Sequence, residues 1–337
     1  MKKMLEKLID NRDLTESESF EVINSILSGE VTEGQMGAFL TTLQAKGVTV
    51  DEICGAAYAM RSKARRVQSL KNNTLDTVGT GGDGGMTFNI STTVAFVAAG
   101  AGAVVAKHGN RASSGKSGSA DCLEALGMNL EAEPEIMEEA LNELGITFLF
   151  APSFHKAMRF AAKVRRELGV RTLFNLLGPL TNPAGAPYQL IGVFAPELTE
   201  TFANVLKKLG SRRVLVVHGS DGMDEITLTG PSRCSELKDG VVRTYDIDPY
   251  MYFGDYCTNE DLEGGDATDN AKITKSILKG EIQGPKRNIV LLNSAASLLS
   301  ADLVKDLNEG IRRSEESIDS GAAYDKLVRL IEYSKNG

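Results

Sequence analysis

Two stretches of the chain carry residues whose types and spacing suit the binding of phosphate groups. The first has five glycines within seven positions, which disfavours a helix or strand because each glycine costs about 0.5–1 kcal/mol relative to alanine there. A loop with so little side-chain bulk can bring its backbone N–H groups against an anion. The glycines and the polar residues that follow them are Gly79, Gly81, Gly82, Gly84, Gly85, Thr87, Asn89, Ser91 and Thr92.

The second stretch combines cations with hydroxyl and amide groups. It comprises Lys107, Asn110, Arg111, Ser113, Ser114, Lys116, Ser117 and Ser119. This density of donors suits an extended polyanion better than a single phosphate. A carboxylate repels phosphate, so Asp83 in the first stretch points to a sugar hydroxyl or to a nearby cation. The alternative, an ordinary polar surface loop, does not explain the regular elements that surround both stretches.

These surrounding elements predict a βαβ unit. Leu75–Val78 has the apolar character of a short buried strand, and the small apolar residues of Thr92–Ala101 indicate a helix packed closely on a sheet. Ala103–Ala106 predicts a second strand, with Lys107 and His108 at its C-terminal end. The N-terminus of the helix would then face the glycine loop, which is a natural place for phosphate.

Two nucleotide-binding motifs almost fit this region, and we reject both. Gly79, Gly81 and Gly84 satisfy the pattern G-x-G-x-x-G, but a dinucleotide fold needs an Asp or Glu about 20 residues later for the ribose. The residues 106–108 occupy that place and supply a cation instead. Gly109–Ser117 resembles a P-loop but has one residue too many between its glycines.

A pair of acids far downstream is expected at the same place. Arg213–His218 predicts a buried strand, and the loop after it contains Asp224 and Glu225. Ligands of parallel sheets collect beyond the carboxyl ends of the strands, so these acids should reach the glycine loop. Adjacent carboxylates in an anion-binding pocket suit a divalent metal, and hard oxygen ligands favour Mg²⁺. The alternative is an Asp-Gly turn with solvated acids, as for Asp221-Gly222.

One arginine stands apart in a basic helix predicted over Lys156–Leu168. Arg159, Lys163 and Arg166 share one face of that helix, whereas Arg165 points elsewhere, toward the side of two alanines. We therefore expect Arg165 to be the cation that turns inward.

The remaining patterns predict the fold. Residues 1–70 contain three capping-box signatures, each followed by an apolar periodic run, and therefore indicate a small all-helical domain. Strands predicted over Ile146–Phe150 and Gln189–Phe194 alternate with helices, which indicates a larger α/β domain with a mostly parallel central sheet flanked by helices. A hairpin is expected around Asp239-Gly240, and a helical stretch over Asp302–Ser334 closes the sheet.

Composition excludes several classes of protein. The chain has 337 residues, 42% hydrophobic residues and a net charge of −8, which argues against non-specific nucleic-acid binding. It has no apolar run of about 18 residues, so we expect no membrane association. The N-terminal sequence lacks an apolar signal region, and four scattered cysteines read as reduced thiols. We therefore expect a cytoplasmic protein.

Four blocks of sequence together resemble the anthranilate phosphoribosyltransferases of tryptophan biosynthesis. They are GTGGDGG with FNIST, KHGNRASSGKSGSAD, VRRELGVRTLFNLLGPLTNP and DGMDE, in order along most of the chain. The resemblance implies transfer of the phosphoribosyl group of 5-phospho-α-D-ribose 1-diphosphate (PRPP) to the amine of anthranilate, which gives N-(5-phosphoribosyl)anthranilate and diphosphate. It also implies Mg²⁺ as cofactor and a homodimer formed through the small helical domain.

The resemblance further implies the residues of the site. PRPP would contact Gly79, Gly82, Asp83, Thr87, Asn89, Ile90, Ser91, Thr92, Lys107, His108, Gly109, Asn110, Arg111, Ala112, Ser113, Ser114, Gly115 and Ser119. Anthranilate would contact Gly79, Asn110 and Arg165, with the arginine fork on its carboxylate. The metal would be held by Ser91, Asp224 and Glu225. No residue is assigned covalent or acid–base chemistry, because an arylamine is already neutral at pH 7.

The resemblance also suggests how the chain divides. Residues 1–70, joined by roughly 156–182, would form the helical domain, and residues 71–155 and 183–337 the PRPP-binding α/β domain. Two alternatives remain. A pyrimidine nucleoside phosphorylase shares this fold but is longer and lacks the GNRASS run and the Asp-Glu pair. A non-catalytic relative that binds nucleic acid conflicts with the net charge and with the DGMDE sequence.

Overall fold

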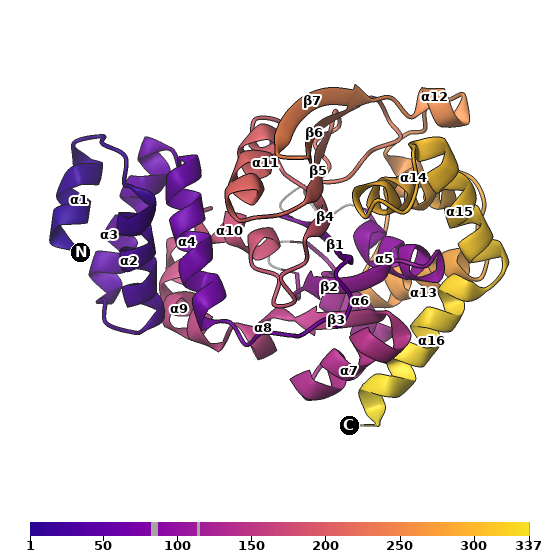
Figure 1. Ribbon diagram of the computed structural model, residues 1–337, viewed down its shortest axis with the longest axis horizontal. Coiled ribbons are helices and arrows are strands. Elements are labelled where there is room, and N and C mark those ends of the chain that lie inside the picture. Colours follow the sequence, from indigo (N-terminus) through magenta and orange to yellow (C-terminus); the bar gives the residue numbers. More distant parts are fainter. Residues whose placement is uncertain (82–86, 113–114, 337) are drawn as a thin grey trace.

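The computed structural model describes residues 1–81, 87–112 and 115–336. It has a small N-terminal helical domain beside a larger α/β domain, which confirms the predicted fold class (Figure 1). Four residues of the predicted site lie outside the described residues, namely Gly82, Asp83, Ser113 and Ser114.

Threonine caps begin three of the four N-terminal helices. These helices are α1 (Lys2–Ile9), α2 (Glu16–Leu27), α3 (Glu33–Lys46) and α4 (Val50–Lys63). Thr15, Thr32 and Thr49 each form both hydrogen bonds of a capping box, as predicted. Glu52 closes the box of α4 and also accepts the N–H of Leu14 at 2.9 Å, although its side chain is fully buried. It thereby ties α4 to the start of α2.

A seven-stranded sheet forms the centre of the α/β domain, in the order β3-β2-β1-β4-β5-β6-β7. The strands are β1 (Thr74–Gly79), β2 (Val104–Gly109), β3 (Ile146–Phe150), β4 (Tyr188–Gly192), β5 (Arg213–Gly219), β6 (Ser232–Lys238) and β7 (Val241–Ile247). Strands β1 to β5 pair in parallel, whereas β6 and β7 pair antiparallel. Asp239 and Gly240 form the β6–β7 turn at φ 51° and 74°, which confirms the predicted hairpin.

Helices cover both faces of this sheet (Figure 1). The helices of this domain include α5 (Ile90–Gly100), α6 (Ser119–Ala125), α7 (Pro134–Leu144), α11 (Leu198–Lys208), α12 (Tyr250–Phe253), α13 (Ala267–Leu278), α14 (Pro285–Ser300), α15 (Leu307–Asp319) and α16 (Ala322–Lys335), of which α5, α7, α11 and α14 contact more than one strand. Leu190 and Leu215 face the apolar core that contains α5 and α14, whereas Ile191 and Val216 face a second core. Burial on both faces is typical of parallel strands.

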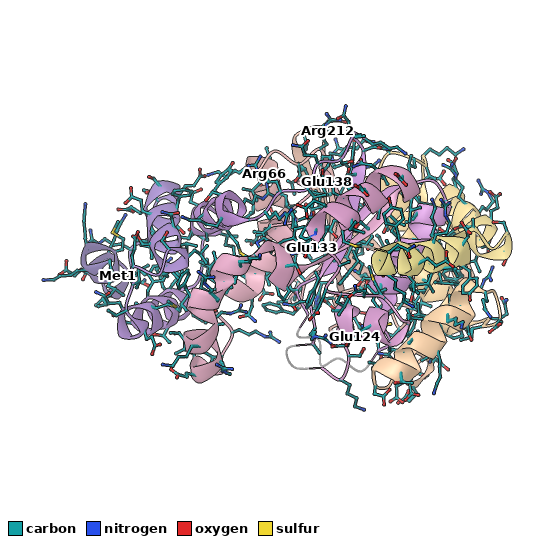
Figure 2. All side chains as sticks on the ribbon, turned by 90° about the horizontal axis from the view of Figure 1, so that it is seen from below. Met1, Arg66, Glu124, Glu133, Glu138 and Arg212 are labelled. Carbon is teal, nitrogen blue, oxygen red and sulfur yellow. The ribbon has the colours of Figure 1, made fainter. Side chains whose placement is uncertain are left out.

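The second core continues from the sheet into the helical domain. It includes buried residues of α2, α3 and α4 together with Ala161 and Val164 of α9 (Arg159–Leu168) and Leu177 of α10 (Phe174–Leu177). The connecting elements between β3 and β4 also include α8 (Ala151–Phe154), η1 (Lys156–Met158) and η2 (Gly178–Leu180). Figure 2 shows Met1 at the end of the molecule away from the α/β domain. The domain boundaries stay a prediction.

The C-terminal region differs from the single helical stretch predicted over Asp302–Ser334. It forms two helices, because Gly321 adopts φ +80° and ends the helical path between α15 and α16. No helix within the described ranges is both long and apolar enough to cross a bilayer.

Candidate active site

The start of the glycine loop meets the downstream acid pair at the carboxyl ends of β1 and β5, which lie on either side of β4 in the sheet. The backbone N–H of Gly81, just after β1, donates to Asp224 Oδ2 at 2.7 Å. Asp224 lies in the loop that follows β5, so a contact between residues 143 positions apart confirms that both loops share one edge of the sheet. A Cβ atom at Gly79 would lie 2.2 Å from Asp224 Oδ2, so the close approach requires glycine there.

Lys107, near the end of β2, is buried with its side-chain nitrogen already hydrogen-bonded. Its side chain is 3% exposed, and Nζ donates to the Thr77 carbonyl at 2.5 Å and to Ser91 Oγ at 3.2 Å. Burial lowers the pKa of Lys107, whereas the negative charges of Asp76, Glu225 and Asp224 oppose that shift. Lys107 therefore joins β1 to the Ser91 hydroxyl and lies within electrostatic reach of the downstream carboxylates.

Asn89 joins the two polar stretches that the sequence singled out. Its side-chain amide donates to the Ser117 carbonyl at 3.1 Å, and its Oδ1 accepts from Ser117 Oγ at 3.0 Å. Asn270 of α13 donates to the same Oδ1 at 3.0 Å. Asn89 thus holds the second stretch against the N-terminus of α5, where the helix dipole favours an anion. Ile90 begins α5 and is buried beneath this end.

Further predicted residues of the first stretch line this helix terminus. Thr92 is buried, and its Oγ1 has no hydrogen-bond partner among the residues that the structure describes. Thr87 forms an isolated antiparallel bridge with Glu263. These contacts place the strand-like segment before α5 beside the loop that precedes α13.

Asp121 organises the second stretch, and the sequence reasoning missed it. Its Oδ2 accepts the N–H groups of Ala112 and Gly118, each at 2.9 Å, and its Oδ1 accepts from Arg111 at 3.0 Å. Although burial opposes the shift, these donors lower the pKa of Asp121. Its place as the third residue of α6 is a capping position, which is the signal that could have indicated this role.

The Arg111 guanidinium points to α6 rather than to the glycine loop. It makes two hydrogen bonds with Glu124, at 2.7 and 2.9 Å, and its pKa is raised chiefly by this carboxylate. Asn110 is exposed, and its side chain accepts the Arg111 N–H at 2.8 Å. The Asn110 carbonyl accepts from Ser119 Oγ at 3.2 Å. Gly109, the last residue of β2, leads into this turn, and Gly115 is exposed within it.

The residues around Asp224 suit a hard cation whose coordination shell is completed by water or by a bound phosphate. No group of three or more His, Cys, Asp or Glu side chains that could hold a metal occurs in the described part of the chain. Two adjacent carboxylates and the Ser91 hydroxyl are oxygen donors, which Mg²⁺ prefers, and Mg²⁺ commonly completes its shell with water and substrate phosphate. The donor set therefore fits Mg²⁺ bound together with a phosphorylated ligand.

The neighbouring Asp221 has a different role. It accepts the Met223 N–H at 3.1 Å and the hydroxyls of Thr227 and Thr229 at 2.6 and 2.8 Å. Gly222 follows with φ +91°. The Asp221-Gly222 turn is thus structural, as the alternative interpretation held for that pair, and it shapes the loop that carries Asp224.

Arg165 is the inward-facing cation of α9, as predicted. Its guanidinium carbon lies 5.5 Å from the ring centre of Phe174, and it is half-buried, whereas Arg159, Lys163 and Arg166 are exposed. Burial lowers the pKa of Arg165. An arginine on an aromatic face keeps its planar fork available for a carboxylate.

Two buried histidines lie between the α/β domain and the connecting elements. His108 Nδ1 is 3.2 Å from the Gly178 carbonyl, and the rings of His108 and His155 are 5.1 Å apart at 54°. Burial lowers the pKa of His108 to about 3 and that of His155 to about 4. Both rings are therefore neutral at pH 7. The Nε2 atoms of both have no partner among the described residues.

Comparisons with known proteins give a consistent family. Residues 2–64 match the glycosyl transferase family, helical bundle domain, and residues 71–324 match the glycosyl transferase family, a/b domain. The chain is 54% identical to the anthranilate phosphoribosyltransferase of Desulfosudis oleivorans over 332 residues, which cover 98% of each chain. It is 54% identical to that of Syntrophobacter fumaroxidans over 330 residues, with the same coverage.

Solved structures agree. The anthranilate phosphoribosyltransferase of Thermus thermophilus superposes with a TM-score of 0.93 at 45% identity and covers 98% of this chain and 99% of its own. The Saccharomyces cerevisiae enzyme in complex with PRPP and Mg superposes with a TM-score of 0.91 at 28% identity, over 99% and 97% of the two chains. On the identity, the coverage and the shared fold, the chain belongs to the anthranilate phosphoribosyltransferase family.

Proposed function

We propose that this protein transfers the phosphoribosyl group of PRPP to the amine of anthranilate, with release of diphosphate, in tryptophan biosynthesis. The hydrogen bond between the Gly81 N–H and Asp224 carries the proposal, because it joins an amide-rich loop and a carboxylate pair at one sheet edge. Backbone amides can bind a diphosphate, and the carboxylate pair can bind a metal ion. The relatives named above support anthranilate as the acceptor.

The proposed binding residues follow the predicted assignment. The diphosphate and ribose would lie along the glycine loop, the N-terminus of α5 and the turn from Lys107 to Ser119. Ser91, Asp224 and Glu225 would hold Mg²⁺, which supplies positive charge to the departing diphosphate when it is bound. Lys107 would lie beside the diphosphate, near the end of β2. The turn after β2, which Asp121 holds together, would present its backbone to the ligand.

The reaction requires orientation more than proton abstraction. The arylamine is a neutral nucleophile, so the chain needs no general base to activate it. Arg165 would bind the anthranilate carboxylate and so direct the amine toward the ribose. His108 and His155 are neutral and border the same connecting elements, so they add no positive charge where the ribose becomes cationic. Dipoles and charges that are already fixed around the charges developing in the transition state lower the barrier to phosphoribosyl transfer.

Turnover assays test this function directly. We expect conversion of anthranilate and PRPP that depends on Mg²⁺, and no phosphorolysis of thymidine. In the variant Asp224→Ala/Glu225→Ala, this Mg²⁺-dependent turnover should be lost while the circular dichroism spectrum is retained. Phosphorolysis of thymidine would instead identify a pyrimidine nucleoside phosphorylase. An inert protein that shifts a DNA probe would identify the nucleic-acid-binding relative.

We also propose a homodimer formed through the helical domain. Exposed apolar side chains support it, because Ile9 at the end of α1 is 71% exposed and Phe160 of α9 is 38% exposed. Sedimentation should give a mass of twice 36.1 kDa, and Ile9→Lys/Phe160→Lys should give monomers. A monomeric parent protein would refute the proposal. The proposed location is the cytoplasm, which is supported by four cysteines that are all free thiols.

A further inference from the structure

The loop that carries Asp224 and Glu225 packs closely against Gly192, a glycine outside the predicted site. Gly192 is the last residue of β4, between β1 and β5 in the sheet. A Cβ atom at this position would lie 1.5 Å from the Asp224 carbonyl oxygen and 2.3 Å from the Asp224 carbonyl carbon. Both atoms are backbone, so no side-chain rotation could relieve the overlap, and the loop itself would have to move.

A buried amide of α14 fixes the same loop at a second point. Asn293 of α14 is fully buried, and its Oδ1 accepts the Ile226 N–H at 3.0 Å while its Nδ2 donates to the Ile226 carbonyl at 2.9 Å. Ile226 directly follows Glu225. Asn293 also donates to the Ile289 carbonyl of its own helix at 2.9 Å, so its side chain has one orientation.

These contacts differ from ordinary core packing because they act on the backbone of the acids' own loop. Asp221 stabilises the loop internally through Met223, Thr227 and Thr229, but it does not fix the loop relative to the sheet. The backbone contacts at Gly192 and Asn293 do so, one from the strand edge and one from the covering helix. Together they determine how far the two carboxylates stand from the glycine loop.

We propose that Gly192 and Asn293 are positioning residues for the metal and diphosphate site. They hold the Asp224-Glu225 loop between the end of β4 and α14, so that the Asp224 carboxylate meets the Gly81 amide and Glu225 follows it in the same loop. The proposal rests on the proposed function, since it assigns that function's metal site two supports. Groups that orient metal ligands commonly change metal affinity by about 10–100-fold when they are removed.

Binding of Mn²⁺, measured by electron paramagnetic resonance in the presence of inorganic diphosphate, tests the proposal. We expect Gly192→Ala and Asn293→Ala each to weaken Mn²⁺ binding at least about tenfold. Each should raise the KM for PRPP while the KM for anthranilate changes less than twofold. Ser297→Ala is the matched control, because Ser297 is a buried residue of α14 whose hydroxyl donates to the Asn293 backbone carbonyl one turn earlier in the same helix, and it makes no hydrogen bond with the Asp224-Glu225 loop within the described residues. It should bind Mn²⁺ like the parent protein.

The outcomes separate the two proposals. If the parent protein binds no Mn²⁺ with diphosphate, the proposed function fails. If the parent binds it and a folded Gly192→Ala or Asn293→Ala variant binds it within twofold of the parent, the positioning role is refuted. Should Gly192→Ala not fold, Asn293→Ala decides alone, and Asn293→Asp gives a second measurement because it keeps the acceptor for the Ile226 N–H and loses the donor.

Discussion

Acid should destabilise this protein through the buried pair His108 and His155. The ordinary histidine pKa is 6.5, whereas burial lowers that of His155 to about 4 and that of His108 to about 3. Between these values and 6.5, the unfolded chain binds protons that the native chain does not. The stability that each neutral ring contributes is therefore complete above pH 6.5 and is lost as the pH falls toward the folded pKa.

The size of the loss follows from the linkage. At pH 5 each histidine costs about 2 kcal/mol of unfolding free energy relative to pH 7.5, because the unfolded pKa lies about 1.5 units above pH 5. This figure does not depend on the folded pKa as long as that pKa is below 5. Asp76 acts in the opposite direction, since burial raises its pKa to about 6 and protonation relieves its charge. The pH-dependent contribution of Asp76 to the unfolding free energy is the same in the parent protein and in histidine variants, so it cancels when they are compared.

Urea unfolding at pH 7.5 and pH 5, followed by both circular dichroism and tyrosine fluorescence, measures the effect. We expect His155→Gln to lose about 2 kcal/mol less than the parent protein between these pH values, because only the parent must exclude that proton. The comparison within each variant across pH removes the cost of the substitution itself. Equal losses in parent and variant, within about 0.5 kcal/mol, would refute the reasoning that His155 is buried in its neutral form.

Three further predictions concern single residues. Arg165→Ala should raise the KM for anthranilate at least about tenfold, as expected for a lost charged hydrogen bond, with little change in the KM for PRPP; equal changes in steady-state assays would reassign Arg165. Asp121→Ala should free the N–H groups of Ala112 and Gly118 and raise the KM for PRPP about tenfold, whereas an unchanged value would show that this turn does not touch PRPP. Glu52→Ala should lower the unfolding free energy by about 1–3 kcal/mol in denaturant titrations, because the buried Leu14 N–H loses its acceptor. Lys46 loses one of its carboxylate partners but keeps Asp13, and a loss below about 0.5 kcal/mol would contradict this role of Glu52.

Local chemistry along the chain was enough to predict the elements and their order. The threonine capping boxes, the Asp239-Gly240 turn and the apolar strands all depend on contacts between residues close in sequence. The glycine loop before α5 stays a prediction from composition, because residues 82–86 lie outside the described residues. Arg165 was identified by helical periodicity alone, and it does turn inward. The helical stretch predicted over Asp302–Ser334 did not take account of the stop signal at Gly321, where the structure divides it into α15 and α16.

Tertiary structure decided which distant groups meet and which charged side chains are already paired within the protein. Arg111 is a residue type that commonly binds phosphate, but its guanidinium donates hydrogen bonds to Glu124 and Asp121 of α6. Lys107 is buried against Thr77 and Ser91, which no spacing rule indicates. Gly192 and Asn293 carry no motif at all, because their importance arises from backbone approaches between a strand end, a helix and a loop. Such contacts depend on how the whole sheet is covered, and a sequence pattern records only neighbours along the chain.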